Sequence, residues 1–307
     1  MTDPDTPGGP TVAVVLVEFR SAGLVAERAT WVRDQGYFVA VADNSATYDG
    51  PGLVVDTGGN VGFGAACNRA VAQLPPSVEI VVFMNPDAEI TSADLAELIR
   101  QVRGGAWQML APATASLSGA TIGFRLPDPY RELAVTLREA RRLRREGATP
   151  TPTATAPDSR SERPRTEAGR FGSGALVVIG RTAFEAVGGY DDRYFLYVED
   201  ADLWDRVERS GARVGFHPGA LLVHRSGSGS PASRASRAVL RRLGVELYLE
   251  DRGRPIRLVR RAHRLLFPAI RGGDELAGVV DEGYRSGVSA AEISLAVRDA
   301  ALATRGG

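Results

Sequence analysis

The sequence predicts an α/β protein with a mostly parallel central sheet flanked by helices, and a helical C-terminal extension. Short β-branched apolar runs alternate with helix-compatible stretches in the N-terminal part, which is the pattern of a parallel sheet. After Ser230 the pattern is helical, at about 232–250, 255–270, 273–285 and 289–304. The 307 residues, 44% of them hydrophobic, are enough to bury a substantial core.

Composition excludes several classes of protein. Lys+Arg and Asp+Glu both total 37, and this balance argues against a nucleic-acid binder. Every basic residue is arginine, which we attribute first to genomic base composition and second to phosphate binding. Cys67 is the single cysteine, so an internal disulfide and a cysteine-rich zinc site are excluded. The N-terminus resembles no signal peptide and no apolar run reaches about 18 residues, so we expect a cytoplasmic protein without a membrane span.

The N-terminal elements follow in a regular order. We predict strands at 12–19, 38–42, 53–55 and 79–84. Helices are predicted at 24–35, 65–74 and 92–103, the last with Ser92 as its N-cap. In such sheets ligands bind beyond the carboxyl ends of the strands, so polar residues at those ends are candidates for a site.

Three polar segments lie at such positions. Asp43-Asn44-Ser45 could bond a nucleobase or ribose, although an Asx turn explains it equally well. The glycine-rich loop 58–64 could admit a phosphate, or simply turn into a helix, and it matches neither a Walker A loop nor the GxGxxG spacing. Asp87 of Asn85-Pro86-Asp87 could bind Mg²⁺ or Mn²⁺, or act as a turn or capping residue.

The densest chemistry lies between residues 171 and 228. Four acids fall within seven positions, Glu199, Asp200, Asp202 and Asp205, and their repulsion needs an offset. They begin a helix that ends near Arg209, where acids also suit the helix dipole, and aromatic residues surround them. A carboxylate against an aromatic wall suits a general base, whereas Asp205 reads as plain helix surface.

Two stretches are rich in arginine. Residues 130–146 predict a solvated basic helix, and 147–169 predict a disordered insertion because they are rich in Thr, Pro, Ser and Arg. Residues 254–271 interleave arginine with apolar side chains. Such a stretch suits an anionic membrane surface, and a helix packed on the core with its arginines in solvent accounts for it equally well.

Taken together, the motifs resemble the inverting glycosyltransferases of family 2, with the GT-A fold, in their rhamnosyltransferase-like branch. The resemblance runs from about Val12 to Ser230. The matching segments are Asp43-Asn44-Ser45; Asn60, Gly62, Phe63, Gly64 and Asn68; Asn85-Pro86-Asp87; the signature from Gly188 to Arg206; and the tail from Pro218 to Ser228. Two positions depart from the pattern: the first strand ends Phe19-Arg20, and no glycine separates Asn44 from Ser45.

The resemblance implies transfer of a sugar from a nucleoside-diphosphate sugar, dTDP-rhamnose-like or a UDP-sugar, to an acceptor hydroxyl with inversion. Asp200 matches the general base, and Asp87 with His224 would hold Mg²⁺ or Mn²⁺. The implied donor-binding residues are Asp43, Asn44, Ser45, Asn60, Gly62, Phe63, Asn68, Asn85 and Asp87. The implied acceptor-side residues are Gly174, Tyr197, Glu199, Asp202, Trp204 and Arg206. The acceptor is a lipid-linked or cell-surface glycan or a small natural product, and a homodimer is compatible with this class.

We therefore predict a catalytic domain over residues 1–230 and a helical extension over 231–307. The nucleotide-sugar half covers about 10–110 and the acceptor half about 111–230. A sugar nucleotidyltransferase is an alternative, but Phe19-Arg20-Ser21-Ala22-Gly23-Leu24 is a poor match to its loop after the first strand. A non-catalytic nucleotide-sugar binder would need neither Asp87 nor Asp200. A polysaccharide synthase would carry membrane spans and a Q-x-x-R-W motif, which are missing.

Overall fold

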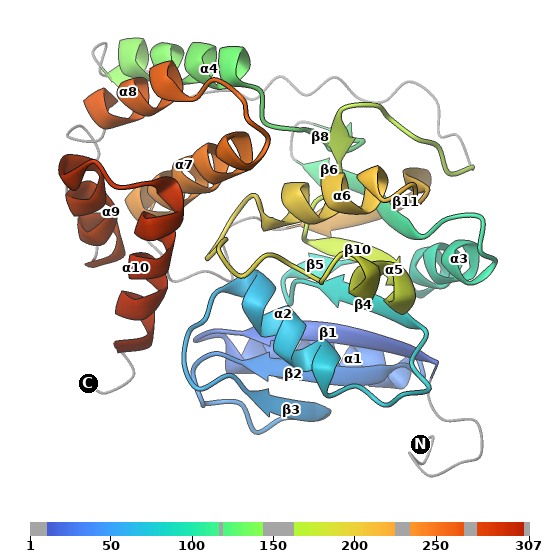
Figure 1. The fold of residues 1–307 in the computed structure, drawn as a ribbon. Coiled ribbons are helices and arrows are strands. Elements are labelled where there is room, and N and C mark those ends of the chain that lie inside the picture. Colours follow the sequence, from blue (N-terminus) through green and yellow to red (C-terminus); the bar gives the residue numbers. More distant parts are fainter. Residues whose placement is uncertain (1–10, 117–118, 144–162, 225–233, 267–274, 304–307) are drawn as a thin grey trace.

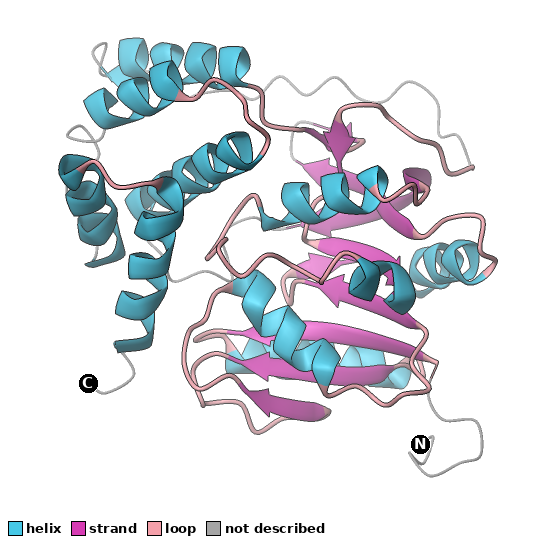
Figure 2. Cartoon of the chain, viewed as in Figure 1, coloured by secondary structure: helices cyan, strands magenta, loops and turns pink. Residues whose placement is uncertain are grey.

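A computed structural model describes residues 11–116, 119–143, 163–224, 234–266 and 275–303. The chain folds around a nine-stranded sheet with the order β3-β2-β1-β4-β10-β6-β11-β5, and β7 pairs with β6. Strands β1 to β4 are parallel, β6 and β11 are parallel to each other, and β10 runs antiparallel between β4 and β6. Figures 1 and 2 show helices on both faces, which confirms the predicted mostly parallel sheet.

The elements have the following bounds. The strands are β1 (Val12–Glu18), β2 (Phe38–Asp43), β3 (Leu53–Asp56), β4 (Ile80–Met84), β5 (Ala88–Glu89), β6 (Met109–Ser116), β7 (Gly119–Thr121), β8 (Phe124–Arg125), β9 (Arg170–Phe171), β10 (Leu176–Gly180) and β11 (Val214–His224). The helices are α1 (Ala22–Asp34), α2 (Phe63–Ala72), α3 (Ser92–Arg103), α4 (Pro129–Leu143), α5 (Arg181–Ala186), α6 (Glu199–Arg209), α7 (Arg234–Asp251), α8 (Arg257–Leu266), α9 (Glu275–Ser286) and α10 (Ala290–Ala303).

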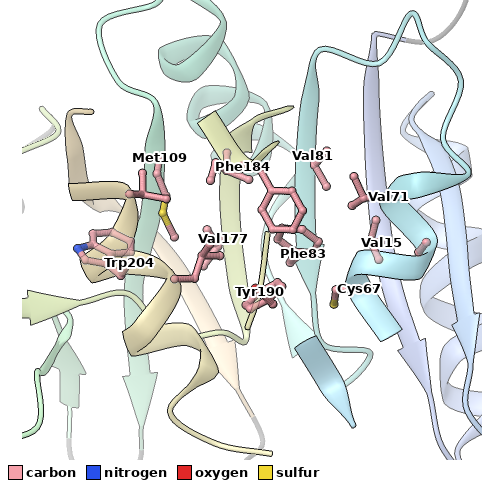
Figure 3. Close-up of a cluster of buried hydrophobic side chains, with 14 of the residues drawn as sticks. Val15, Cys67, Val71, Val81, Phe83, Met109, Val177, Phe184, Tyr190 and Trp204 are labelled. Carbon is pink, nitrogen blue, oxygen red and sulfur yellow. The ribbon is translucent and has the colours of Figure 1, made fainter. Parts of the chain in front are cut away.

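Both faces of the sheet are covered, so its central strands are buried throughout. In β1, Val14 and Leu16 join the cluster that packs on α1 and α3. The alternate residue Val15 points to the opposite face, toward α2, α5 and α6. Figure 3 shows this second cluster, where Phe184 of α5 and Trp204 of α6 lie against the sheet. Burial on both faces explains why the first strands read as continuous apolar runs.

The predicted N-terminal strands and helices are all present, with shifts of a few residues at their ends. The N-cap of α3 is Thr91 rather than Ser92, because the Thr91 side chain accepts a hydrogen bond from the backbone N–H of Asp94 at 3.1 Å. Three central strands, β6, β10 and β11, lie outside the predicted set.

The disorder predicted for 147–169 is wrong at its C-terminal end. Residues 163–169 belong to the described chain, and Arg165 exchanges two backbone hydrogen bonds with Phe216 of β11, at 2.9 and 2.8 Å. This pairing holds the segment on the sheet. Residues 144–162 and the predicted domain boundary at residue 230 lie outside the described residues.

Helices α7 to α10 form a third hydrophobic cluster with the chain that leads into α6. Leu243 of α7, Val259 of α8 and Val280 of α9 are buried in it, together with Phe195 and Val198. Figure 1 shows these helices stacked at one side of the sheet. None of the helices in the described part combines the length and apolar character that crossing a membrane requires.

Candidate active site

Two carboxylates face each other where β1 and β2 end. The parallel register sets Glu18 opposite Asp43, and both side chains are buried. Burial is the main cause that raises the pKa of Glu18. Burial opposes ionisation of Asp43 too, but hydrogen bonds from Glu18 and from backbone N–H groups, including that of Tyr48 at 3.0 Å, lower its pKa. Of the two carboxyls, Glu18 therefore has the higher proton affinity.

This pair fixes the loop that the sequence assigns to the nucleobase. Ser45 donates its side-chain hydroxyl to Glu18, and its backbone N–H to Asp43 at 2.9 Å. Asp43 thus shapes the loop from within, as an Asx turn does. Glu18 is not among the residues predicted from the sequence, although its position at the end of a buried strand, in register with Asp43, was a usable signal.

Asn44 joins this loop to the glycine-rich loop. Its buried amide donates to the side-chain oxygen of Asn60 at 3.3 Å and to the carbonyl of Gly62 at 3.1 Å. The Thr57 hydroxyl donates to the Asn44 oxygen at 2.7 Å. These bonds hold Asn44 and Asn60 side by side, next to the ends of the first strands.

The glycine-rich loop lies against the aromatic run that precedes α6. Gly62 has a φ of 88°, and the backbone N–H of Phe63 donates to the carbonyl of Phe195 at 3.1 Å. A Cβ on Gly62 would overlap that carbonyl oxygen. The glycine therefore permits a close approach to another segment of this chain, where the sequence suggested an approach to phosphate.

Asn68, on α2, is a second cross-link between the donor-side and acceptor-side halves. Its amide donates to the Tyr190 carbonyl and to Asp192, both at 2.8 Å, and its oxygen accepts the Tyr190 N–H at 2.9 Å. All these bonds go to the segment that begins with the Gly188-Gly189 pair. In this structure Asn68 positions that segment.

The candidate metal site forms where β4 ends. Asn85-Pro86-Asp87 leads into β5, whose antiparallel pairing sets His224 of β11 opposite Ala88. The His224 Nε2 atom then lies 3.2 Å from a carboxylate oxygen of Asp87 and 3.5 Å from the Asn85 amide nitrogen. The structure thus brings together three residues that the sequence places 139 positions apart at most.

Asp87 and His224 fit a divalent cation. Mg²⁺ and Mn²⁺ at diphosphate sites take one or two protein ligands, with substrate and water oxygens completing the shell. A carboxylate oxygen and an imidazole nitrogen 3.2 Å apart are both within reach of one ion. Among the described residues, no group of three or more His, Cys, Asp or Glu side chains is placed so that it could hold a metal ion.

Asp200 is the second residue of α6. It is bonded to the segment 173–175, whose Ala175 carbonyl also accepts the N–H of Asn85 at 2.9 Å. One carboxylate oxygen accepts the N–H of Gly174 at 2.9 Å, and the other accepts the N–H of Ala201 at 2.9 Å. A Cβ on Gly174 would lie 3.2 Å from the Asp200 Cβ, so a larger residue would crowd the carboxylate. Burial raises the pKa of Asp200, with the backbone N–H groups opposing.

The backbone entering α6 is in an unusual conformation. Tyr197 and Val198 both have positive φ, 72° and 74°, and Val198 is the N-cap of the helix. Two successive non-glycine residues in the left-handed region are costly and cluster at functional sites. A Cβ on Gly244 of α7 would lie 2.6 Å from the Tyr197 carbonyl, so the close contact of α7 holds this turn.

The other acids of α6 have roles that differ from those predicted. Asp202, predicted on the acceptor side, is buried and paired with Arg206 at 2.7 Å and with Arg252 at 3.1 Å. Asp205, predicted as helix surface, is also buried and lies 2.6 Å from Arg252. Burial, followed by the charge of Asp200, raises the pKa of Glu199 well above its usual range.

Two further residues predicted on the acceptor side, Trp204 and Arg206, pack against or bond other parts of the chain. Trp204 is 1% exposed and stacks on Phe216 with ring centroids 5.0 Å apart, so it belongs to the core. Arg206 donates to the carbonyls of Val187 and Gly189, both at 2.8 Å, and so ties the glycine pair to α6. Arg252, which links Asp202 and Asp205, had no sequence signal because it lies beyond the matching motifs.

The sheet order agrees with the GT-A fold, with polar loops after β1 and β2, a carboxylate after β4 and an acid at the start of α6. A mannosyltransferase from Pyrobaculum calidifontis, solved with GDP-Man and Mn²⁺, shares the fold with a TM-score of 0.51 and 17% identity, covering 98% of this chain and 88% of that one. No protein-family profile matches the chain.

In sequence, the chain is similar to N-acetylglucosaminyl-diphospho-decaprenol L-rhamnosyltransferase of Mycobacterium tuberculosis, in strains CDC 1551 / Oshkosh and ATCC 25618 / H37Rv. Identity is 28% over 244 residues, which cover 70% of this chain and 75% of each relative. The chain therefore has the GT-A fold and is rhamnosyltransferase-like, as its motifs predict.

Proposed function

We propose that the chain transfers a sugar from a nucleoside-diphosphate sugar, of the dTDP-rhamnose kind, to a hydroxyl of a lipid-linked glycan, with inversion. The similarity to an enzyme named for an L-rhamnosyl transfer and an N-acetylglucosaminyl-diphospho-decaprenol acceptor supports this choice of substrates.

One observation carries the proposal. The segment Ser173-Gly174-Ala175 connects the two chemical groups that the reaction needs. The N–H of Asn85 donates to the Ala175 carbonyl at 2.9 Å, and the N–H of Gly174 donates to Asp200 at 2.9 Å. These two bonds link the segment that carries Asp87 to Asp200 through one short stretch of chain, which supports a site where a metal and a base act on the same substrate.

In the proposed reaction, Asp200 takes the proton from the acceptor hydroxyl as its oxygen attacks the anomeric carbon. The raised pKa of Asp200 suits this role, because a base with higher proton affinity is a better acceptor for a hydroxyl proton. Asp87 and His224 hold the divalent cation, which when bound neutralises the departing diphosphate. Glu18, Asp43 and Asn44 set the loops that receive the nucleotide.

Replacing Asp200 tests the assignment of the base. Asp200→Asn keeps the shape of the side chain and one oxygen that can accept a backbone hydrogen bond, but it removes the base, so kcat should fall by about 10²–10⁴-fold. Donor binding, measured by calorimetry with the nucleoside diphosphate and Mn²⁺, should change less than about twofold. Asp34→Asn, on the exposed end of α1, is the matched control. Activity within about tenfold of the wild type in Asp200→Asn would remove Asp200 from this role.

A further inference from the structure

The described side chains on the outward face of α4 are basic and apolar. Its described exposed positions are Tyr130, Arg131, Ala134, Val135 and Arg138, which have the i, i+1, i+4, i+5, i+8 spacing of one helix face. Tyr130 is 76% exposed and Val135 is 39% exposed. A large aromatic side chain that is so exposed suggests a contact surface rather than a packing position.

Helix α8 repeats the pattern. Its described exposed positions are Arg257, Leu258 and Arg261, and Leu258 is 65% exposed. On the buried side of the helix, Val259 packs in the hydrophobic cluster of the C-terminal helices, and His263 lies against the buried Glu246. Figure 1 shows α4 and α8 side by side at one end of the molecule, and the two helices contact each other.

Two acids of these helices and of the neighbouring α7 are buried and paired, whereas Asp128, just before α4, is exposed. Glu132 of α4 is buried and lies 3.5 Å from Arg241. Glu246 of α7 accepts from Arg260 at 3.1 Å and lies 2.7 Å from His263. No ion pair within the described chain involves the four exposed arginines, Arg131, Arg138, Arg257 and Arg261. The outward face therefore has positive charge, although the whole chain is neutral.

This face is connected to the start of α6. Leu133 of α4 and Val259 of α8 pack in the same hydrophobic cluster as Val198, the N-cap of α6. Asp200 lies two residues further on. Helices α4 and α8 therefore share one hydrophobic cluster with the residue that precedes α6, the helix of the proposed base.

We propose that the face formed by Tyr130, Arg131, Val135, Arg138, Arg257, Leu258 and Arg261, the α4/α8 face, docks on an anionic lipid bilayer. Exposed aromatic and aliphatic side chains that enter the interface, surrounded by arginines, are the composition of helices lying in the plane of a membrane. The arginines would contact lipid phosphates, while Tyr130 and Leu258 would reach the acyl boundary. Docking goes beyond the proposed reaction and does not depend on it.

Co-sedimentation with vesicles tests the proposal without any substrate. The full-length protein should bind vesicles of phosphatidylglycerol and phosphatidylcholine at low salt, and phosphatidylcholine vesicles far less. Arg257→Gln/Arg261→Gln should lower the partition coefficient about 25-fold, since each arginine near such a surface contributes about fivefold. The matched control is Arg100→Gln/Arg103→Gln, two exposed arginines of α3, which should bind as the wild type does.

Tyr130→Ser/Leu258→Ser tests the apolar part separately and should also weaken binding. Because all these side chains are exposed, circular dichroism and melting temperature should be unchanged in each variant. The proposal fails if the wild type does not sediment with anionic vesicles, or if the α3 and α8 arginine variants bind equally. A concentration-dependent dimer without vesicle binding would assign the face to protein contact instead. Donor-binding calorimetry with the nucleoside diphosphate reports separately on the proposed reaction.

Discussion

Gly62→Ala perturbs the contact that joins the donor-side loop to the segment entering α6. A methyl group at Gly62 would overlap the Phe195 carbonyl oxygen and lie 2.9 Å from its carbonyl carbon. The neighbour is backbone, so it cannot rotate away as a side chain could. Either the loop moves back or Phe195 shifts, and both changes break the Phe63–Phe195 hydrogen bond.

The magnitude follows from three contributions. Gly62 has a φ of 88° and a ψ of −178°, a combination essentially restricted to glycine, so an alanine there costs about 1–3 kcal/mol. Loss of the hydrogen bond from Phe63 costs about 1 kcal/mol. Relief of the overlap costs about 1–2 kcal/mol in displaced backbone and packing. We therefore expect Gly62→Ala to lower the free energy of unfolding by about 3–6 kcal/mol.

The free energy of unfolding is measured by urea unfolding, and variants at two other glycines separate these contributions. Gly36 has a φ of 82°, but a methyl group there would have no atom within 4 Å, so Gly36→Ala carries only the conformational cost. Gly23, in the first turn of α1, has neither a positive φ nor an atom within 4 Å of an added methyl group. Gly23→Ala should therefore be neutral or stabilise the protein by about 0.5 kcal/mol. If Gly62→Ala costs no more than Gly36→Ala, the contact with Phe195 does not constrain the loop and our account of Gly62 is wrong.

Three further outcomes follow from the site. Burial and the charge of Asp200 raise the pKa of Glu199 above its ordinary 4.5. The native state therefore binds that proton more tightly than the unfolded state, and the free energy of unfolding falls as pH rises past about 4.5. Glu199→Gln should thus raise the melting temperature at about pH 7 and much less near about pH 4. Arg252→Met leaves two buried carboxylates short of a partner and should cost about 3 kcal/mol in urea unfolding. EDTA should abolish transfer, and Asp87→Ala or His224→Ala should weaken Mn²⁺-dependent binding of nucleoside diphosphate about tenfold or more.

Each of these three predictions can be contradicted by a specific result. An equal gain in melting temperature for Glu199→Gln at both pH values would mean that folding does not raise the pKa of Glu199. Arg100→Gln, at a side chain 68% exposed, is the control for Arg252→Met and should change stability by less than about 0.5 kcal/mol; equal losses would show that the buried network is unimportant. Full activity in EDTA would exclude the metal.

Much of the fold was predictable because local patterns carried it. The strand runs ending at Asp43 and at Met84 are apolar, β-branched and bounded by polar turns, so their ends and the residues after them could be placed. Strands β6 and β11 were harder, because β6 contains a proline and β11 carries a bulge after His217. Their positions depend on pairing with neighbouring strands rather than on an apolar pattern in their own sequence.

The sequence indicated candidate site residues, but it did not indicate the contacts that these residues make. A motif identifies Asn44, Asn68 and Trp204, but only the fold shows that Asn44 and Asn68 hold other segments and that Trp204 is core. The left-handed turn at Tyr197 and Val198 had no sequence signal, since neither is glycine or asparagine. It is held by α7, more than forty residues further along the chain.

The four acids of α6 coexist because their charges are handled differently. Asp202 and Asp205 are balanced by arginines, each of which can bond two oxygens at once, so Arg252 spans both carboxylates. A lysine could not bridge them with the same fixed geometry, which gives the all-arginine composition a structural use here. Burial and the charge of Asp200 raise the pKa of Glu199 well above its usual range, so protonation of this acid costs less than in water. Asp200 is bonded to the backbone N–H groups of Gly174 and Ala201 rather than to an arginine, which sets it apart from Asp202 and Asp205.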